Sequence, residues 1–510
     1  MKTGLSTFAG WGRRYGLDAL LLLVAVGLAL PTLSYPLFRD QAHHFYVGRW
    51  WIEGLQPYRD AFDLKPPFIF ALHAIGCALF SVPTWWIRLL DLLSVVGVSL
   101  LVAVSIPRRT ERRRGEVGGV VLLGVLMYYT LFDYICSAQC ESFMGFTLLL
   151  GWLAATRIRS WRRAAFLAGV LSAVAIGFKT PGLIPAIGIA SLLSWRVWRE
   201  TAERRSVVVA VGWYSLGGLA VALPVLLWFA THGALNDLIE AMTAYTLKYA
   251  DDNPINAAGQ RWRIHYFFVE RAGAWTWLAG LLMVTGIVAV WRSRDVEGKR
   301  YAVGGLVMLL AAGLAVVAQG RYFAYHWVAL FPFAMALMAL GISQFLNWRP
   351  QIAGVVLPFM LMVTLALPGD RDYLEYLERW WRYQEGGITR DGFLNLFQSN
   401  WKFNARDSER LSSRVRDLAR PGDRLSSLNR EPNINVLADL RAPTAHPAWY
   451  PPMLTYKDGE WVKQRDEAIR RHEVRFVVVP TEDKRIIANM YRMGYRTVMV
   501  CNALTLLDGG

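Results

Sequence analysis

The sequence predicts a mainly α-helical polytopic membrane protein, with about 11 transmembrane helices and a small C-terminal extracytoplasmic α/β domain. Three observations predict this fold class: the 510 residues are 54% hydrophobic, only 18% are charged, and the chain turns polar after Pro368. Soluble domains carry roughly 25% charged residues, so the composition argues against an ordinary soluble enzyme and excludes a disordered chain. Four cysteines in the whole chain exclude a disulfide-stapled scaffold.

The transmembrane helices are predicted from apolar runs, several of which approach the roughly 20 residues that cross the hydrocarbon core of a bilayer. We expect spans at 17–33, 86–106, 117–135, 141–156, 165–182, 183–195, 206–230, 273–291, 301–318, 327–345 and 351–367. The run 66–83 contains His73 and ends at Pro83, so we expect a re-entrant or interfacial helix there. Residues 1–367 thus form the predicted transmembrane domain, with outer loops at 34–85 and 231–271.

The basic residues predict the orientation of these spans. One set of loops carries 21 Lys and Arg in 57 residues: 1–16, 107–116, 157–163, 196–205, 292–300 and 346–350. The positive-inside rule places these loops and the N-terminus in the cytoplasm of a cell whose cytoplasmic membrane holds the protein. Topology therefore accounts for most of the net charge of +16, and a nucleic-acid groove is a poor explanation of it.

Residues 368–510 are predicted to form a separate soluble domain. The runs 475–480 and 497–500 are typical of buried strands, and residues 462–472 and 482–493 of helices. An odd number of spans places this domain outside the cytoplasm. The i,i+4 spacing of Cys136 and Cys140 suits one helix face better than a disulfide, so we expect free thiols.

The first outer loop holds the most informative polar residues. Asp40 closely follows the first span, where a carboxylate is costly unless it is paired or functional. A solvated loop acid, or an N-cap for a helix over 41–53, is the structural alternative. Lys65 precedes Pro66 and Pro67, which favour an extended Lys65 and a helix beginning directly after it. A cation beside a helix N-terminus suits an anion, although a snorkelling interfacial lysine fits equally well.

Further acids and bases fall at the outer ends of other spans. These are Glu141, Lys179, Arg321, Tyr325 and His326, and the loop 231–271 adds Tyr245, Lys248, Tyr249, Asp251, Asp252, Arg261, Arg263 and His265. We expect such residues to line one polar cavity at the outer surface. There the cations would hold a phosphate and a carboxylate would remove a proton from an incoming hydroxyl or amine.

No cofactor is predicted. The sequence contains no zinc-type Cys/His cluster, no phosphate-binding loop and no nucleophile elbow. Asp251 and Asp252 are a weak divalent-metal candidate, for which a plain surface turn is the simpler interpretation. The need for a divalent metal therefore stays open.

Several of these segments together resemble the polytopic GT-C glycosyltransferases, in the branch that contains the protein O-mannosyltransferases and the bacterial aminoarabinose transferase for lipid A. The resemblance rests on Asp40 after the first span, Gly54 to Tyr58, Asp63-Leu64-Lys65-Pro66-Pro67, Arg88, Glu141, Phe178 to Gly182, Gly320 to Pro332, and Pro421 to Arg424. Two departures stand out. Gln41 replaces an acid that many relatives carry, and Lys179-Thr180-Pro181 replaces their Thr-Lys-Gly.

The resemblance implies a hexosyl or pentosyl transferase that moves a single sugar from a polyprenyl phosphate to an acceptor on the extracytoplasmic face. The reaction would be inverting, with Asp40 as the base. Lys65 and Arg321, then Lys248 and Arg263, would bind the donor phosphate. Asp63 and Glu141 would orient Lys65 or bind the sugar, and His43, Tyr58, Tyr325 and His326 are further candidates for sugar, acceptor or orientation. The acceptor would be a cell-envelope glycolipid, polysaccharide or protein; the sugar and the oligomeric state are left open.

Three other functions compete with this interpretation. A lipid-sugar flippase or transporter would suit charges within the membrane, but such proteins often show repeated halves, and no repeat is visible. A lipid-linked oligosaccharide ligase or polymerase would share the topology and the anionic lipid substrate. A non-enzymatic assembly protein would use the tail as a binding module. The segment from Asp40 to Lys65 favours the single-sugar transferase.

Overall fold

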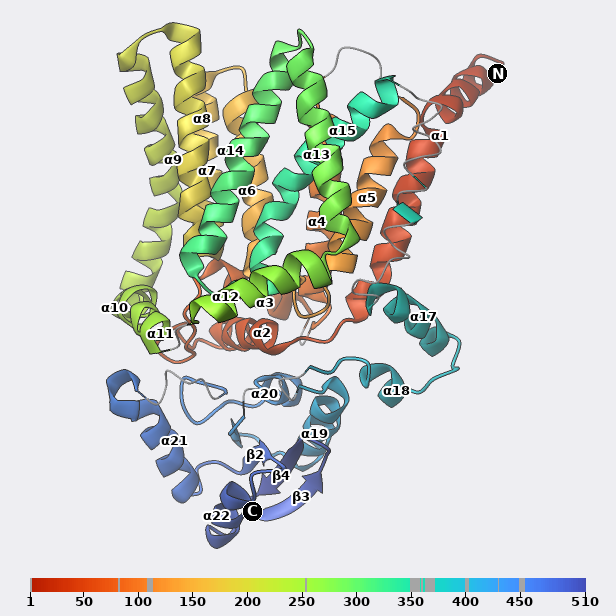
Figure 1. Cartoon of the computed structure of the whole chain (residues 1–510). Helices are drawn as coiled ribbons and strands as arrows, with labels where there is room; N and C mark the ends of the chain where they lie inside the picture. Colours follow the sequence, from red (N-terminus) through yellow and green to blue (C-terminus); the bar gives the residue numbers. More distant parts are fainter. Residues whose placement is uncertain are drawn as a thin grey trace. The chain divides into compact units, whose positions relative to one another are not determined.

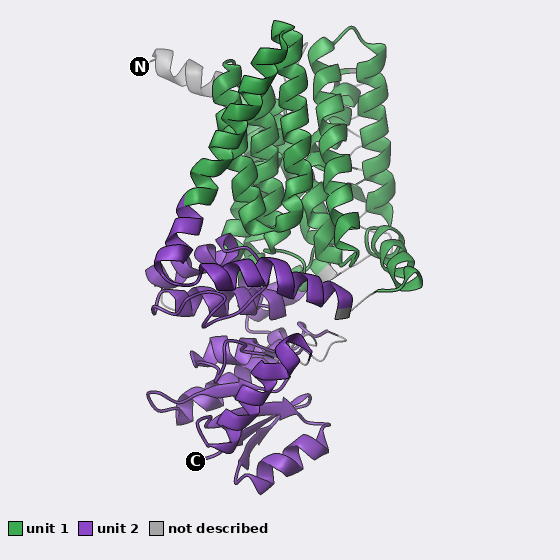
Figure 2. Cartoon of the chain, turned by 90° about the vertical axis from the view of Figure 1, so that its left-hand side faces the viewer, with its two compact units in different colours: residues 1–33, 88–223, 255–378 green, residues 34–87, 224–254, 379–510 purple. Residues whose placement is uncertain are grey.

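The computed structural model contains long helices and one small sheet, divided between two compact units (Figures 1 and 2). Unit 1 comprises residues 1–33, 88–223 and 255–378, and unit 2 comprises residues 34–87, 224–254 and 379–510. The structure describes residues 2–80, 83–107, 113–252, 255–348, 358, 361–362, 372–399, 403–429, 431–448 and 455–510. Each unit is therefore assembled from three separate stretches of the chain. The boundary at 367/368 stays a prediction about where the membrane part ends.

Unit 1 contains most of the long apolar helices. They are α1 (Lys2–Ala29), α4 (Trp86–Ser105), α5 (Glu116–Leu131), α6 (Cys140–Arg157), α7 (Trp161–Phe178), α8 (Leu183–Thr201), α9 (Arg204–Thr231), α13 (Ala274–Arg292), α14 (Val296–Gln319) and α15 (Phe331–Trp348), with α4 and α9 running on into unit 2. Several of these helices pack against each other: α1 on α5, α6 on α7 and α8, and α13 on α14 and α15.

Seven described helical stretches are long and apolar enough to cross a membrane. They are Tyr15–Ser34, Trp86–Ser105, Trp161–Phe178, Arg204–Thr231, Ala274–Arg292, Val296–Gln319 and Ala324–Asn347. This result supports a multi-pass membrane protein, while the number of about 11 spans stays a prediction. The predicted span 351–367 falls almost entirely outside the described residues.

Several predicted spans end at different residues in the structure, as in 165–182, where α7 ends at Phe178. The prediction 117–135 was too long, because α5 ends at Leu131. The carboxylate of Asp133 accepts from the backbone N of Ile135 at 2.9 Å and of Cys136 at 3.0 Å, and this local turn replaces the helical ladder. The prediction 183–195 was too short, since α8 continues to Thr201 as a basic, more exposed helix end.

The segment 231–271, expected to be a loop, is largely helical. It contains α10 (Leu235–Glu240), α11 (Thr246–Asp252), α12 (Ala257–His265) and two π-helical turns, Ala241–Tyr245 and Tyr266–Arg271. These helices are short and carry charged residues, so they contain no apolar run that would predict them from the sequence. The division between the units falls inside this segment.

Unit 2 combines the first outer loop with the C-terminal tail. The loop forms α2 (Arg39–Trp51) and α3 (Phe68–Phe80). The tail forms α17 (Asp372–Gln384), whose first residues belong to unit 1, and α18 (Arg390–Leu394), α19 (Ala405–Leu418), α20 (Asn433–Ala438), α21 (Glu460–Arg470), α22 (Lys484–Arg492), β1 (Leu425–Ser427), β2 (Phe476–Pro480), β3 (Arg496–Val500) and β4 (Leu504–Asp508). The predicted α/β character is confirmed for the tail.

The sheet of the tail has the strand order β1-β2-β4-β3, in which only the β1–β2 pair is parallel. The strands predicted at 475–480 and 497–500 correspond to β2 and β3, whereas β1 and β4 were not predicted. The burial predicted for 497–500 is wrong, because the residues of β3 are exposed or half-buried at the edge of the sheet. β2 is buried on both faces: Phe476 and Val478 pack into one apolar cluster, and Val477 and Val479 into another. The four cysteines are free thiols, as expected for Cys136 and Cys140.

Contacts to the tail anchor α2 in unit 2. Nε of Arg39 lies 2.7 Å from Oε1 of Glu431, and both side chains are buried. At the other end of the helix, Arg49 forms an ion pair of 3.0 Å with Asp439. Between them, the backbone N of Ala442 donates to the Tyr46 hydroxyl at 2.9 Å. These contacts fix α2 at both ends, and α2 carries the first candidate residues of the site.

Candidate functional site

Asp40 lies in the first turn of α2 and is not the N-cap. Phe38 occupies the N-cap position, and its backbone N donates to Oε1 of Gln41 at 2.7 Å. Asp40 is half-buried, and no described residue forms a hydrogen bond or ion pair with its carboxylate. The position favours a negative charge because it is close to the positive end of the helix dipole. The N-cap alternative is therefore wrong, and Asp40 keeps an unengaged carboxylate.

His43 and His44 connect α2 to the following loop. His43 lies one helical turn after Asp40, on the same helix face. Its Nε2 is 2.7 Å from the carbonyl oxygen of Phe62, and Nε2 of His44 is 3.5 Å from Oδ2 of Asp63. Both histidines are buried. Asp40 thus shares a helix face with side chains that hold the 62–63 segment.

Asp63 is a buried anion surrounded by cationic and imidazole groups. Its Oδ1 accepts from the backbone N of Leu64 at 2.6 Å and lies 3.8 Å from Nζ of Lys65. Burial opposes ionisation, but Lys65, His43 and His44 outweigh it and lower the pKa of Asp63 to about 2. Asp63 therefore stays ionised at neutral pH and stands beside Lys65, as expected for a residue that orients it.

A strained turn precedes Lys65. Tyr58 has a φ of 74°, which is uncommon for a residue with a side chain. Its hydroxyl donates to the carbonyl oxygen of Lys65 at 2.9 Å, and this bond closes the loop from 58 to 65. Such strain persists where the surroundings enforce it, which is common at binding sites. After Lys65 the helix α3 begins at Phe68, slightly later than predicted.

Buried rings from the tail and from the turn Ala241–Tyr245 pack against this loop. The backbone N of Phe62 donates to the carbonyl oxygen of Ala445 at 2.9 Å. The Phe62 ring lies 4.8 Å from the His446 ring and 4.7 Å from the Tyr245 ring, between centroids. The tail thus braces the first outer loop within unit 2. Lys248 lies on α11 in the same unit.

His446 is a residue of this unit that the sequence did not single out. It is buried, and no described residue hydrogen-bonds to either ring nitrogen. Burial is the main reason that its pKa falls to about 3, so the ring is neutral. The one signal in the sequence was a single histidine before Pro447, too weak to single it out.

Unit 1 holds a second polar cluster, around Glu141 in the first turn of α6. Nζ of Lys179 forms a short ion pair with Oε1 of Glu141, and both side chains are buried. Nε2 of His326 lies 3.8 Å from the same oxygen. The ring of Tyr325 lies 5.5 Å from the Lys179 ammonium, within cation–π distance. Lys179 is thus the nearest cation to Glu141 in this unit.

Arg263 and Arg321 also come together in unit 1. Nη1 of Arg263 donates to the backbone oxygen of Arg321 at 2.8 Å, and its guanidinium lies 4.5 Å from the ring centroid of Phe323. Arg321 itself is buried, with 9% of its surface exposed. These contacts position two arginines that the sequence analysis assigned to phosphate binding.

The described residues contain no group of three or more His, Cys, Asp or Glu side chains arranged to hold a metal ion. Asp251 is exposed on α11.

Comparisons with known proteins identify the fold. No family model and no curated protein sequence matches the chain. Among solved structures, the chain resembles ArnT from Cupriavidus metallidurans bound to undecaprenyl phosphate, with a TM-score of 0.59, 14% identity, and coverage of 97% of this chain and 98% of ArnT. The apo form of that protein gives a TM-score of 0.55 at 14% identity, covering 99% and 98%.

A weaker likeness is to the oligosaccharyltransferase of Archaeoglobus fulgidus, with a TM-score of 0.49 and 13% identity, over 97% of this chain and 74% of that one. ArnT is the lipid A aminoarabinose transferase, and both proteins are GT-C glycosyltransferases. The likeness to ArnT shows that the chain has the GT-C fold over nearly its whole length, as the resemblance in its sequence implied.

Proposed function

We propose that this chain, which has the GT-C fold, is a glycosyltransferase that moves one sugar from a polyprenyl-phosphate donor to an acceptor. One observation carries the proposal: within unit 2, a carboxylate without a described partner, Asp40, shares a helix face with residues that hold the Asp63–Lys65 segment. The likeness to ArnT bound to undecaprenyl phosphate supports a lipid-phosphate donor.

The reaction is an inverting displacement at the anomeric carbon. The hydroxyl or amine of the acceptor attacks that carbon and forms the new glycosidic bond, while its proton passes to a carboxylate. The bond between the anomeric carbon and the phosphate oxygen breaks, and polyprenyl phosphate leaves with the bonding electron pair. The leaving phosphate already carries charge, so it needs cations more than it needs a general acid.

Asp40 suits the base better than Asp63 does. The pKa of Asp63 is lowered to about 2, so its carboxylate is a weak base near neutral pH. Asp40 carries no such pairing among the described residues. We assign Asp63 to holding Lys65, and Lys65 to the leaving phosphate. Arg321, Arg263 and Lys248 stay candidates for phosphate binding, and His43, Tyr58, Tyr325 and His326 for sugar, acceptor or orientation.

We place the protein in the cytoplasmic membrane, with the N-terminus in the cytoplasm and residues 34–85, 231–271 and 368–510 outside it. The charge bias of the loops supports this orientation. The partners that follow are a polyprenyl-phosphate sugar made inside and presented outside, and an acceptor of the cell envelope.

The proposal is tested by donor turnover with pure protein in lipid nanodiscs. A panel of labelled polyprenyl-phosphate sugars is offered together with an acceptor extract from the source membrane. We expect the label to transfer from one donor, with release of polyprenyl phosphate. Glu53→Gln is a matched control for variants of Asp40, because it also removes one acid near α2, at an exposed position.

Two outcomes would redirect the proposal. Bound donors that never turn over across a broad panel would favour a flippase. Turnover of lipid-linked oligosaccharides, but of no single-sugar donor, would favour a ligase or polymerase.

A further inference from the structure

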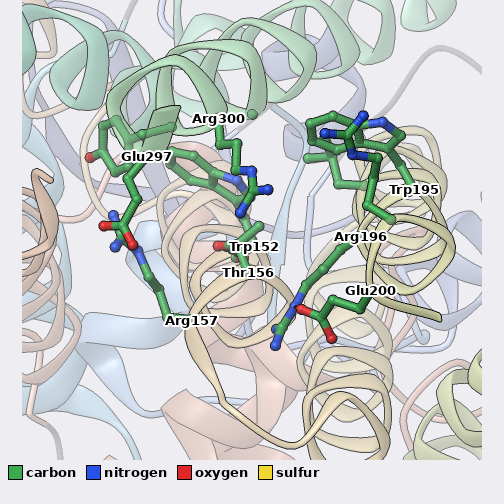
Figure 3. A pocket seen from close by; sticks show the side chains of 12 residues that line it. Trp152, Thr156, Arg157, Trp195, Arg196, Glu200, Glu297 and Arg300 are labelled. Carbon is green, nitrogen blue, oxygen red and sulfur yellow. Dashed lines mark hydrogen bonds and ion pairs between the residues drawn. The ribbon is translucent and has the colours of Figure 1, made fainter. Parts of the chain in front are cut away.

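A basic pocket lies in unit 1 at the end of the helices where the loops are rich in arginine. Figure 3 shows its lining side chains, which come from the C-terminal ends of α6 and α8 and the N-terminal end of α14. Its volume is about 190 Å³. This is roughly twelve times the cavity volume of about 15 Å³ that one water molecule requires. Arg157 and Glu141 lie at opposite ends of α6, about 24 Å apart along the helix axis.

The pocket carries an excess of positive charge. It is lined by Arg157, Arg196, Arg199 and Arg300, against the two acids Glu200 and Glu297. The folded chain uses two of the arginines: Arg196 pairs with Glu200 at 2.7 Å, and Arg157 donates to the backbone oxygen of Ser105 at 2.7 Å. For Arg199 and Arg300, no hydrogen bond or ion pair to a described residue is present. Two guanidinium groups are therefore available to an anion.

A buried indole provides a second, independent sign of a ligand. Trp152 is 1% exposed and lines the same pocket, and no described residue accepts a hydrogen bond from its Nε1. The absent side chain of Gly304 makes room for this ring, because a Cβ there would lie 2.6 Å from Nε1. A buried N–H without a partner is costly. An oxygen of a bound anion would satisfy it.

The surroundings favour a lipid as the source of that anion. α8 and α14 expose large apolar side chains beyond the pocket, such as Ile187 at 58% and Leu310 at 67%, so acyl chains cover both helices in a membrane. Trp195, 44% exposed, lines the pocket, and tryptophan is typical of the membrane–water interface. Basic pockets between transmembrane helices on the cytoplasmic side suit anionic headgroups.

We propose that this pocket binds the phosphodiester headgroup of an anionic phospholipid from the cytoplasmic leaflet. Arg199 and Arg300 hold the phosphate oxygens, and Nε1 of Trp152 donates to one of them. The site is independent of the proposed transfer reaction, because none of its residues belongs to the clusters around Asp40 or Glu141.

The test uses the full chain in nanodiscs of phosphatidylcholine with phosphatidylglycerol, followed by native mass spectrometry of the lipids that stay bound. We expect the wild type to retain phosphatidylglycerol in preference to phosphatidylcholine. Arg199→Ala/Arg300→Ala should reduce this retention about tenfold, since it removes two charge-assisted contacts. Trp152→Phe keeps the ring, removes the donor, and should reduce retention by a smaller factor.

Arg204→Ala/Arg205→Ala is the matched control, because it removes the same charge from the first turn of α9 without touching the pocket. Thermal unfolding in detergent identifies any variant that fails to fold, and Trp152→Phe then carries the test. The proposal would be overturned if the wild type retained both lipids equally. It would also be overturned if the double variant retained as much phosphatidylglycerol as the wild type. Binding of inorganic phosphate with no retained phosphatidylglycerol would overturn the lipid source.

Discussion

The polar clusters of the two units differ in how their carboxylates are engaged. In unit 1, Glu141 is buried and bound by Lys179, with His326 close by. In unit 2, Asp63 is engaged in the same way, but the neighbouring loop and helix also present Asp40, which no described residue engages. A buried ion pair is costly to break, whereas an unengaged carboxylate is available for chemistry. Variants of the first cluster should therefore lose stability, and variants of the second should lose activity.

The largest expected effect is on stability in unit 1. Glu141→Gln leaves the Lys179 ammonium buried without its anion, and breaking one partner of a buried pair costs about 3–5 kcal/mol. Thermal unfolding in detergent measures this loss. The double variant Glu141→Gln/Lys179→Met removes both charges and should recover much of it. A stable Glu141→Gln protein that no longer transfers sugar would instead assign Glu141 to the reaction.

The next effect is on activity in unit 2. Lys65→Ala should lower transfer about 100-fold, as expected when a cation that stabilises a leaving phosphate is removed. Steady-state turnover with a fixed donor measures it, and Lys65→Arg should restore part of the rate. Unchanged donor affinity and turnover in Lys65→Ala would leave Lys65 as a snorkelling residue.

A third prediction concerns acid sensitivity. The pKa of His446 in the folded protein is about 3 and its ordinary value is 6.5, mainly because of burial, so the folded state binds fewer protons between these values. The contribution of His446 to stability therefore falls as pH falls below 6.5, by about 2 kcal/mol at pH 5. Glu431, whose pKa burial raises to about 7, contributes in the opposite direction. Asp63 contributes no loss of stability in this window, because its pKa is about 2 in the folded state and 3.8 in the unfolded state.

His446→Gln should remove this pH dependence, which hydrogen exchange of residues 442–448 at pH 5 and 7 detects. His472→Gln is the control, because His472 is exposed in the same unit. Equal acid sensitivity of the wild type and His446→Gln would contradict the assignment.

The smallest effect is expected from Tyr58→Phe. This change removes only the hydroxyl that donates to the backbone oxygen of Lys65, a bond worth about 1 kcal/mol. The KM for the donor should rise a few-fold while kcat changes little, since the bond positions Lys65 without touching the reacting atoms. A fall in kcat at constant KM would show that Tyr58 acts in the chemical step.

The sequence predicted the parts of the fold that depend on hydropathy and on local pattern. Long apolar runs predicted most of the spans, and alternating or buried runs predicted β2 and β3. Side-chain hydrogen bonds set other boundaries, as where Asp133 ends α5. Short helices with charged residues, such as α12, leave no comparable signal.

The candidate site was predictable only as a set of residues. Asp40, Asp63 and Lys65 lie within one loop, so their proximity followed from sequence separation. The pair Lys179–Glu141 joins residues 38 positions apart, and Phe62–His446 joins the first loop to the tail. Contacts of this kind depend on the tertiary packing of distant segments, which a single sequence does not reveal.

The central claim is that Asp40 supplies the base while other residues bind the donor. The most direct test measures donor affinity and donor turnover on the same preparation of Asp40→Asn, beside the wild type. The account predicts an affinity within about twofold of wild type and turnover reduced at least about 100-fold. Full turnover in a folded Asp40→Asn protein, or a loss confined to donor binding, would contradict it.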